Sequence, residues 1–138
     1  MSALKIVAAL LKADPEIQSL TGGRVFLLRR PQTSQLPAIT VTNIYEGEDQ
    51  HLAGATAYFE ATIAVACFAG SAVATDDLGE AVKACLSDIT ETAVESGESP
   101  PAPFGTATIW KSGGDVMDWS EDNSVVRRII DFTVRWRR

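Results

Sequence analysis

The stretch "AYFEATIAVACFAGSAVATDDLGEAVKACL", residues 57–86, changes its apolar periodicity at Gly70. Before the glycine, apolar side chains recur at every second position, and this alternation predicts a half-buried strand over residues 58–68. After the glycine the period becomes 3.6, with one apolar stripe running from Leu78 to Ile89, which predicts an amphipathic helix. A strand that leads directly into a helix indicates a fold containing both kinds of element.

Two shorter helices are expected before this region. Ser2 can cap a helix that ends near Ala13, because apolar residues follow it at helical spacing. Asp14 and Pro15 are favourable as the cap and the first residue of a second helix, which extends through Leu20. A glycine pair then stops this helix, since glycine adopts a positive φ at little cost.

The remaining elements follow from apolar alternation and from proline and glycine positions. Besides residues 58–68, strands are expected over residues 24–28, 38–45, 106–111 and 125–136, and loops over 31–37, 46–57, 91–105 and 112–124. Residues 112–124 could include a bulge or a short strand. Consecutive strands with helices on one side predict an α+β fold, a two-layer sandwich in which two main helices cover a mainly antiparallel sheet of four to five strands. Residues 1–138 are expected to form a single domain.

The last strand separates its side chains cleanly by type. Alternation places Phe132 and Trp136 on the buried face, with Arg127, Arg135 and Arg137 on the other. A surface that stacks on nucleic-acid bases would need aromatic and arginine side chains together. The pattern therefore favours arginines that meet carboxylates of a neighbouring protomer, with a small ligand-binding or nucleic-acid-binding α+β domain as the alternative.

Charge is segregated along the chain. Residues 31–124 carry 15 acidic and two basic residues, whereas the two ends carry ten basic and three acidic ones, and these balances of −13 and +7 give the net charge of −6. If this segregation survives folding, one face is basic and another is acidic. Such a protomer is suited to head-to-tail association.

No catalytic, cofactor or metal site is expected from the sequence. His51 is the sole histidine and has no recognisable nucleophile beside it, so it is interpreted as a loop residue rather than a catalytic base. Cys67 and Cys85 are expected to be reduced and mostly buried, because two cysteines form neither a disulfide framework nor a zinc site. The apolar stretches are too short for a membrane helix and the start of the chain has no secretory pattern, which predicts a protein made in the cytosol.

Two charged clusters are candidate interaction sites. Glu46, Glu48 and Asp49 lack the ligand spacing of a calcium loop and are interpreted as a solvated hairpin tip. Arg24, Arg29 and Arg30 flank a loop bounded by two prolines, at residues 31–37. Because prolines restrict the unbound loop, these arginines could form a preorganised contact surface. The alternative is that they are solvated charges that protect a strand edge.

The order of these elements resembles that of the tail-completion, or tail-terminator, proteins of long-tailed bacteriophages and phage-derived particles. The resemblance is carried by "ALLKADPEIQSLTGGRVFLLRRPQTSQLPAITV" near the amino end, "AYFEATIAVACFA" followed by "DDLGEAVKACL" in the middle, and "RRIIDFTVRWRR" at the end. These segments occur in the family's order and cover nearly the whole chain.

What the resemblance implies is a structural virion protein and not an enzyme. Family members would form a ring, expected to be hexameric, at the head-proximal end of the tail tube in the virion, after assembly in the host cytoplasm. The ring would end tube polymerisation and join the tail to the head. Its implied partners are other copies of itself, the tail tube protein and a head-completion or neck protein, with DNA only as passing cargo and no membrane. A neck or minor tail protein is the alternative within the same particle.

Overall fold

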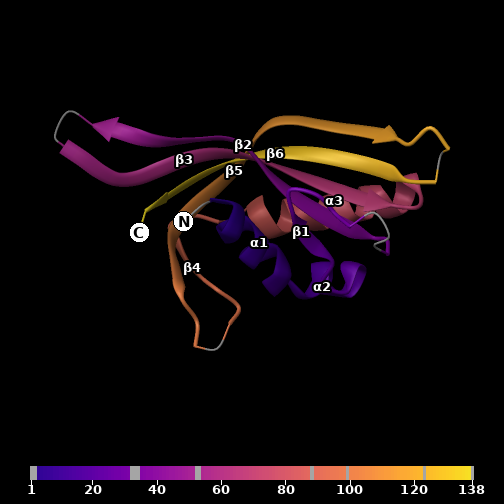
Figure 1. Ribbon diagram of the computed structural model, residues 1–138, viewed down its shortest axis with the longest axis horizontal. Coiled ribbons are helices and arrows are strands. Elements are labelled where there is room, and N and C mark those ends of the chain that lie inside the picture. Colours follow the sequence, from indigo (N-terminus) through magenta and orange to yellow (C-terminus); the bar gives the residue numbers. More distant parts are fainter. Residues whose placement is uncertain are drawn as a thin grey trace.

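The computed structural model (Figure 1) describes the backbone of residues 3–31, 35–51, 54–87, 89–98, 100–122 and 124–137, in which two helices are followed by three strands, a third helix and three further strands. Side chains are described for the same residues except 46–51 and 54–58. The helices are α1 (Ala3–Ala13), α2 (Pro15–Thr21) and α3 (Ala72–Ser87). The strands are β1 (Val25–Leu27), β2 (Ala38–His51), β3 (Gly54–Ala69), β4 (Thr92–Glu95), β5 (Pro103–Trp119) and β6 (Val126–Arg137).

The described strands form one mixed sheet in the order β1-β2-β3-β6-β5-β4. β1 runs parallel to β2, and every other neighbouring pair is antiparallel. The chain therefore places its last strand in the middle of the sheet, between β3 and β5. This position explains why β6 has the clearest alternation in the sequence, because a central strand is constrained by neighbours on both sides.

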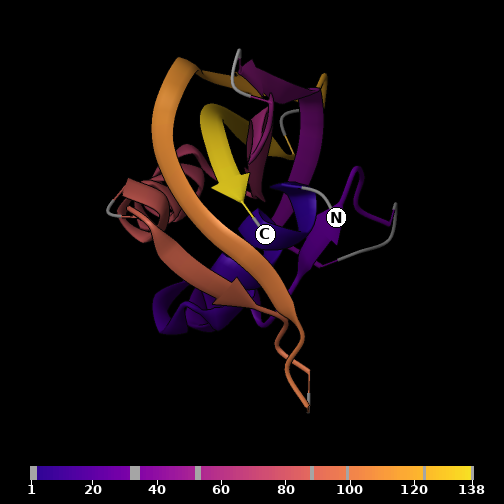
Figure 2. The same ribbon diagram turned by 90° about the vertical axis from the view of Figure 1, so that its left-hand side faces the viewer.

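The sheet curls around the first helix. α1 contacts all six strands, including β1 and β4 at the two opposite edges, which a flat sheet would not allow. The view in Figure 2 shows this curl, with the amino-terminal helices between β5 and the β1–β2 edge. The helices therefore cover the concave face of a half-barrel. In the described part of the chain, no helix covers the convex face.

One apolar core fills the space between the helices and the concave face. From β6 it receives Ile130, Phe132, Val134 and Trp136, each at most 1% exposed, as the alternation predicts. The ring of Phe59 stacks on Trp136 with centroids 5.4 Å apart. Burying such large side chains contributes roughly 1.5 to 3 kcal/mol each relative to exposure, so this layer adds substantially to the stability of the fold.

The predicted end of the first helix at Ala13 and the start of the second at Pro15 are confirmed, α2 ends at Thr21, one residue beyond Leu20, and the predicted cap Ser2 lies outside the described residues. Oδ1 of Asp14 accepts hydrogen bonds from the backbone N–H groups of Glu16, at 2.9 Å, and Ile17, at 3.2 Å. Pro15 begins α2, and Gly22 ends it in the left-handed conformation with φ of 64°. The helix ends are thus determined locally, by a side-chain cap at one end and by glycine at the other.

The architecture corrects part of the predicted fold. The α+β class is confirmed, but the sheet has six strands instead of four to five, and it is a curled half-barrel instead of a two-layer sandwich. Three helices are present in the described residues, and the short α2 packs against α3 as well as α1. Curling was missed because alternation gives the face of each side chain and carries no information about sheet curvature.

Three segments expected to be loops contain strand. Residues 46–51 and 54–57 extend β2 and β3 into a long hairpin, part of 91–105 forms β4 and the start of β5, and β5 continues through most of 112–124 as far as Trp119. Their glycines and polar residues have low strand propensity, but pairing with a neighbouring strand overrides it. In β5 the register shifts between Lys111 and Asp115, so the suggested bulge is present within a longer strand.

Candidate interaction surface

A shallow groove lies on the convex face of the sheet. Its floor is formed by side chains from three adjacent strands, namely Thr40 and Thr42 on β2, Ala64 and Ala66 on β3, and Ile129 on β6. These are small or β-branched residues, and the sequence places them by the same alternation that buries their neighbours. A floor of short side chains allows another polypeptide backbone to approach the sheet closely.

Cationic side chains surround this floor. The segment after β1 contributes Leu28, which is 61% exposed, and then Arg29 and Arg30. The guanidinium carbon of Arg30 lies 4.9 Å from the centre of the Phe68 ring, in a cation–π arrangement. Arg127 of β6 forms another part of the lining. We call this region the convex groove, lined by residues 28–31, by the five floor residues, and by Phe68 and Arg127.

Arg127 is partly neutralised by a carboxylate on the next strand. Its Nε donates to Oδ1 of Asp118 at 2.9 Å, and its Nη2 donates to Oδ2. These hydrogen bonds lower the pKa of Asp118 and raise that of Arg127. Both side chains are more than 40% exposed. An exposed pair of this kind contributes under about 1 kcal/mol to stability, so Arg127 remains available to a partner.

Arg24 lies apart from the groove and has a local role. Its Nε donates to the backbone oxygen of Pro37 at 2.9 Å, which ties the end of the proline-bounded loop to the start of β1. The structure thus separates the three arginines that the sequence presents together. Arg29 and Arg30 reach the convex groove, where folding adds Arg127 from the far end of the chain.

The other charged residues predicted for interaction are distributed over the sheet. Arg137 pairs with Glu91 within the same chain at 3.2 Å. Arg135 lies on β6 between Glu60 of β3 and Thr108 of β5 in the strand register. The final strand was expected to meet carboxylates of a neighbouring protomer, but Arg127 and Arg137 already meet carboxylates of their own chain. The segregated charges are therefore partly recombined on folding.

The acidic cluster of Glu46, Glu48 and Asp49 is in the outer part of β2 by its backbone pairing, together with His51. The side chains of these residues lie outside the described part of the structure. The backbone shows that the segment is a strand, which corrects the predicted hairpin loop. In Figure 1 this hairpin extends beyond the other strands at one end of the molecule.

One arginine on the concave face was not expected from the sequence. Arg128 is 6% exposed, and its Nε and Nη2 each donate to Asp115 at 2.7 Å, while Nη1 donates to the backbone oxygen and Oδ1 of Asp76 at 3.2 Å. The pKa of Asp115 is lowered by these hydrogen bonds from Arg128. Alternation does place residue 128 on the same face as Ile130, so the signal was present but conflicted with the expectation that arginine is exposed.

Gly79 of α3 makes room for this arginine. A Cβ atom at that position would lie 2.6 Å from Cδ and from Nη1 of Arg128. The helix therefore passes directly over the buried guanidinium because it has no side chain there. The arrangement joins α3, β5 and β6 through one cation, and it supports the fold rather than a surface.

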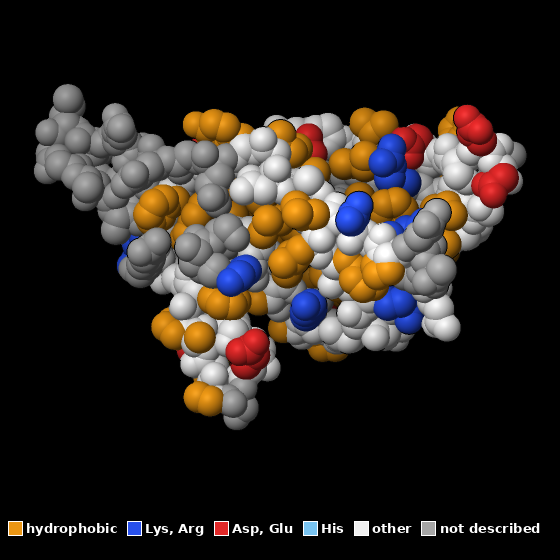
Figure 3. Space-filling view, viewed as in Figure 1, with side chains coloured by type: hydrophobic (Ala, Val, Ile, Leu, Met, Phe, Trp, Pro, Cys, Tyr) orange, Lys and Arg blue, Asp and Glu red, His pale blue; other side chains and the backbone are white. Residues whose placement is uncertain are grey.

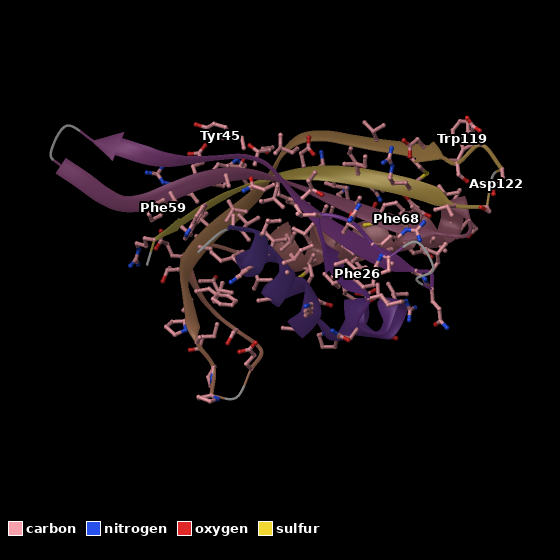
Figure 4. All side chains as sticks on the ribbon, in the orientation of Figure 1. Phe26, Tyr45, Phe59, Phe68, Trp119 and Asp122 are labelled. Carbon is pink, nitrogen blue, oxygen red and sulfur yellow. The ribbon has the colours of Figure 1, made fainter. Side chains whose placement is uncertain are left out.

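The end of the molecule opposite the long hairpin carries both apolar and acidic groups (Figure 4). Trp119 is 69% exposed at the end of β5. In the following turn Asp122 accepts hydrogen bonds from the hydroxyls of Ser120 and Ser124, both at 2.7 Å, which lowers its pKa to about 2. In Figure 3 acidic side chains gather at this end and basic ones are spread over the middle of the visible face.

A second hollow lies between α1 and the β4–β5 hairpin. Its lining includes Lys5 and Lys12 from the helix, Glu95 and Glu98 from the hairpin, and Phe104. Mixed charges around an apolar residue do not favour one sign of ligand. This hollow therefore does not define a binding chemistry, in contrast to the convex groove.

The two thiols are free, as predicted. Cys67 is fully buried, and burial raises its pKa to about 12. Cys85 is half-buried and donates to the backbone oxygen of Leu10 at 3.5 Å, and its pKa is raised to about 12 chiefly by burial and then by Asp14. Thiols of this kind are poor nucleophiles.

The described residues contain no group of three histidine, cysteine, aspartate or glutamate side chains placed to hold a metal ion. None of their helices combines the length and the apolar character required to cross a membrane.

Comparisons with known proteins identify the family. In a solved structure titled "Virion of native gene transfer agent (GTA) particle", one chain is similar to this protein with a TM-score of 0.70 and 15% sequence identity, and the match covers 99% of this chain and 96% of that chain. This likeness supports the fold. No curated protein matches the sequence. The family model described as "Tail completion protein gp17" matches residues 5–99, and the chain therefore belongs to the tail completion protein family.

Proposed function

We propose that this protein forms a closed ring on the head-proximal end of a phage tail tube, where it ends tube polymerisation and joins the tail to the head. The family match carries the proposal, because it includes residues 5–99 and thus α1 to β4 with the segment that lines one side of the convex groove. The similarity of the whole fold to a chain of a virion-type particle adds support.

A cap of this kind requires dissimilar surfaces on each protomer. A ring needs two complementary patches for its neighbours, and it needs different faces toward the tube and toward the head. The protein offers a convex groove with arginines on its rim, an acidic extended hairpin, and an end with an exposed tryptophan and several carboxylates. These surfaces differ in charge and lie on different parts of the molecule, which suits heterologous contacts.

The partners of the ring are the tail tube protein on one side and a head-completion or neck protein on the other. DNA passes through the lumen as cargo and is not recognised. The net charge of −6 supports this role, since an acidic protein repels the phosphate backbone. The proposed reaction is association alone, without a chemical step.

The test is a tube polymerisation experiment with purified tail tube protein. Added before polymerisation, the protein is expected to shorten the tubes in proportion to its concentration, and electron microscopy is expected to show one ring at one end of each tube. Unchanged tube lengths, or binding along tube walls, would contradict the proposal. A variant with the exposed Lys5→Glu and Lys12→Glu substitutions on α1 tests whether general charge affects the result.

A further inference from the structure

The outer half of β5 is an exposed edge of the sheet. β4 pairs with β5 only as far as Ala107, and no described strand lies beyond residues 115–119 on the side away from β6. All residues from Trp110 to Met117 are exposed. Such an edge presents backbone N–H and C=O groups that can pair with a strand of another chain.

The direction of these backbone groups follows from a neighbouring hydrogen bond. The N–H of Ser120 donates across the sheet to the oxygen of Val125 at 2.9 Å. Backbone groups alternate in direction along a strand, so the N–H and C=O groups of Met117 and Trp119 point away from β6. These two residues therefore carry the outward hydrogen-bonding groups of the edge.

The charges that could protect this edge are directed inward. Both oxygens of Asp115 accept hydrogen bonds from Arg128 at 2.7 Å, and Oδ1 of Asp118 accepts one from Arg127 at 2.9 Å. The apolar side chains between and after these carboxylates stay exposed. Edge strands are commonly protected from pairing by charged groups or prolines. With its carboxylates held by β6, this edge is suited to receive a partner strand.

Other carboxylates near the edge select the charge of that partner. Glu121 and Asp122 follow β5 in an exposed turn. Asp76 is exposed on α3 and is joined through Arg128 to Asp115. Two copies of this edge would place like charges together, which disfavours their pairing with each other. The strand that pairs here should carry basic residues together with apolar side chains.

β1, at the opposite edge of the sheet, has this composition. No acidic residue occurs in residues 17–45, whereas Arg24 precedes β1 and Arg29 follows it closely. Leu27 adds an apolar side chain that is 45% exposed. The two free edges of the sheet are therefore complementary in charge, and both carry exposed apolar groups. Phe26 and Trp119, labelled in Figure 4, mark these edges on separate parts of the molecule.

The strand register places the two edges at the same level of the sheet. Phe26 lies opposite Thr40, and this row continues through Ala66 and Ile129 to Val116. The strand directions make β1 antiparallel to β5. A copy rotated about a ring axis can therefore bring its β1 against the β5 of a neighbour in antiparallel orientation, without a change of fold.

We propose that β1 of one copy pairs with residues 115–119 of the next copy, so that the sheet continues from copy to copy around the ring. The N–H of Leu28 donates to the oxygen of Val41 on β2, so that of Leu27 points outward. With Leu27 opposite Met117, this N–H meets a carbonyl of the neighbouring edge, and Arg24 lies beside the acidic turn. The inference rests on the proposed ring and specifies the edges that hold it together.

Proline substitutions remove the outward N–H groups and leave the hydrogen bonds within the sheet intact. Proline is tolerated at such edge positions. Alone, Met117→Pro and Leu27→Pro are each expected to associate roughly tenfold more weakly than the wild type, equivalent to about 1.4 kcal/mol. Sedimentation velocity measures this, and circular dichroism with urea unfolding confirms the fold. Met117→Thr and Leu27→Thr keep the N–H groups and are the matched controls, which should retain most of the association.

Mixing the two proline variants tests the direction of the contact. The Met117→Pro chain keeps an intact β1, and the Leu27→Pro chain keeps an intact β5 edge. One interface can therefore form between them, and assembly then stops. Native mass spectrometry should show heterodimers with one chain of each kind and no ring. Rings formed by the mixture, or a wild type that assembles while the mixture gives no heterodimer, would overturn the proposal.

A disulfide measurement locates the contact without proline. Chains with Leu27→Cys and with Met117→Cys are mixed under mild oxidation, while Cys67 and Cys85 stay protonated because burial raises the pKa of each to about 12. A disulfide between the two chains is expected, since residues opposite each other on paired strands have the required Cα separation. Val116→Cys lies on the other face of β5 and is the control. A disulfide that forms equally well from position 116 would overturn the pairing.

The outcomes separate this inference from the proposed function. If the wild type forms rings on tubes and the folded proline variants do so equally well, the edge pairing is overturned while the ring stands. If the wild type stays monomeric both free and with tubes, the ring is overturned and the edge pairing with it. If rings depend on the two edges but tubes are not shortened, the edge pairing stands and the capping function is overturned.

Discussion

Arg127 and Arg128 are adjacent in the sequence but lie on opposite faces of the sheet and differ in almost every physical respect. Arg128 is 6% exposed and bonds to Asp115 and Asp76 beneath α3. The side chain of Arg127 is 42% exposed and has one carboxylate partner at the lining of the convex groove. The same residue type therefore supports the fold on the concave face and remains accessible to solvent on the convex face.

The difference arises from what replaces water around each guanidinium. Arg128 has lost most of its hydration, so its carboxylate and carbonyl partners are obligatory and their removal leaves buried charge uncompensated. Arg127 keeps water on one side, so its pair with Asp118 is worth little to folding. A partner protein could displace that water and form hydrogen bonds with the exposed guanidinium of Arg127.

The largest loss of stability is expected from a substitution on the concave face. Arg128→Met keeps most of the side-chain volume but leaves Asp115 without its bidentate donor, and we expect the free energy of unfolding to fall by about 3 kcal/mol. Urea unfolding followed by circular dichroism measures this. The double variant Arg128→Met with Asp115→Leu should recover part of the loss, and no recovery would show that the charge on Asp115 is not the cause.

A smaller loss of stability is expected for Gly79→Ala. The added methyl group would lie 2.6 Å from Cδ of Arg128, which cannot move aside without breaking its hydrogen bonds. We expect destabilisation of about 1 to 3 kcal/mol, the usual cost of overpacking. The informative control is Gly79→Ala in the Arg128→Met background, where the methionine can move and the same substitution should cost much less. An equal cost in both backgrounds would argue against the close approach as the cause.

A fall in pH should lower the stability of the fold because it protonates Asp115 on the concave side. Arg128 lowers the pKa of this carboxylate in the folded protein, whereas in the unfolded chain it has its ordinary value of about 3.9. The pair therefore stabilises the fold fully above about pH 4, and this contribution is lost as the pH falls through the lowered pKa. Unfolding measured from pH 6 to pH 2 should show a steeper loss for the wild type than for Arg128→Met, and parallel curves would refute this assignment.

The smallest effect on stability is expected at Arg127. Arg127→Gln should change the free energy of unfolding by under about 1 kcal/mol, because the pair with Asp118 is exposed. Self-association should nevertheless weaken, and the difference from wild type should shrink at high salt as charges are screened. A stability loss as large as that of Arg128→Met would remove the distinction between the two arginines.

Much of the fold could be predicted from sequence because its signals are local. The cap at Asp14, the stop at Gly22 and the alternation that buries Phe132 and Trp136 depend on neighbouring residues alone. The strand nature of residues 112–119 could not be predicted in this way. It depends on pairing with β6 across the following turn, where Asp115 to Trp119 lie opposite Ile130 to Val126, and the residues of the segment alone do not reveal that partner.

The candidate surface was predictable only in part. The proline-bounded segment indicated Arg29 and Arg30, and the last strand indicated Arg127, but their meeting follows from the position of β6 beside β3, which alternation does not determine. Arg128 was missed because arginine is rarely buried without a partner, and its partner Asp115 lies in a segment expected to be a loop. Pairing between strands, which alternation within one segment does not reveal, is thus the common cause of the omissions.

The most direct test of the account is electron microscopy of tail tubes incubated with the purified protein, with reconstruction of the tube ends. The account predicts a closed ring at one end of each tube, in which the concave face of every protomer stays filled by its own helices. Tubes with no ring at either end, or protein bound along the tube walls, would contradict it.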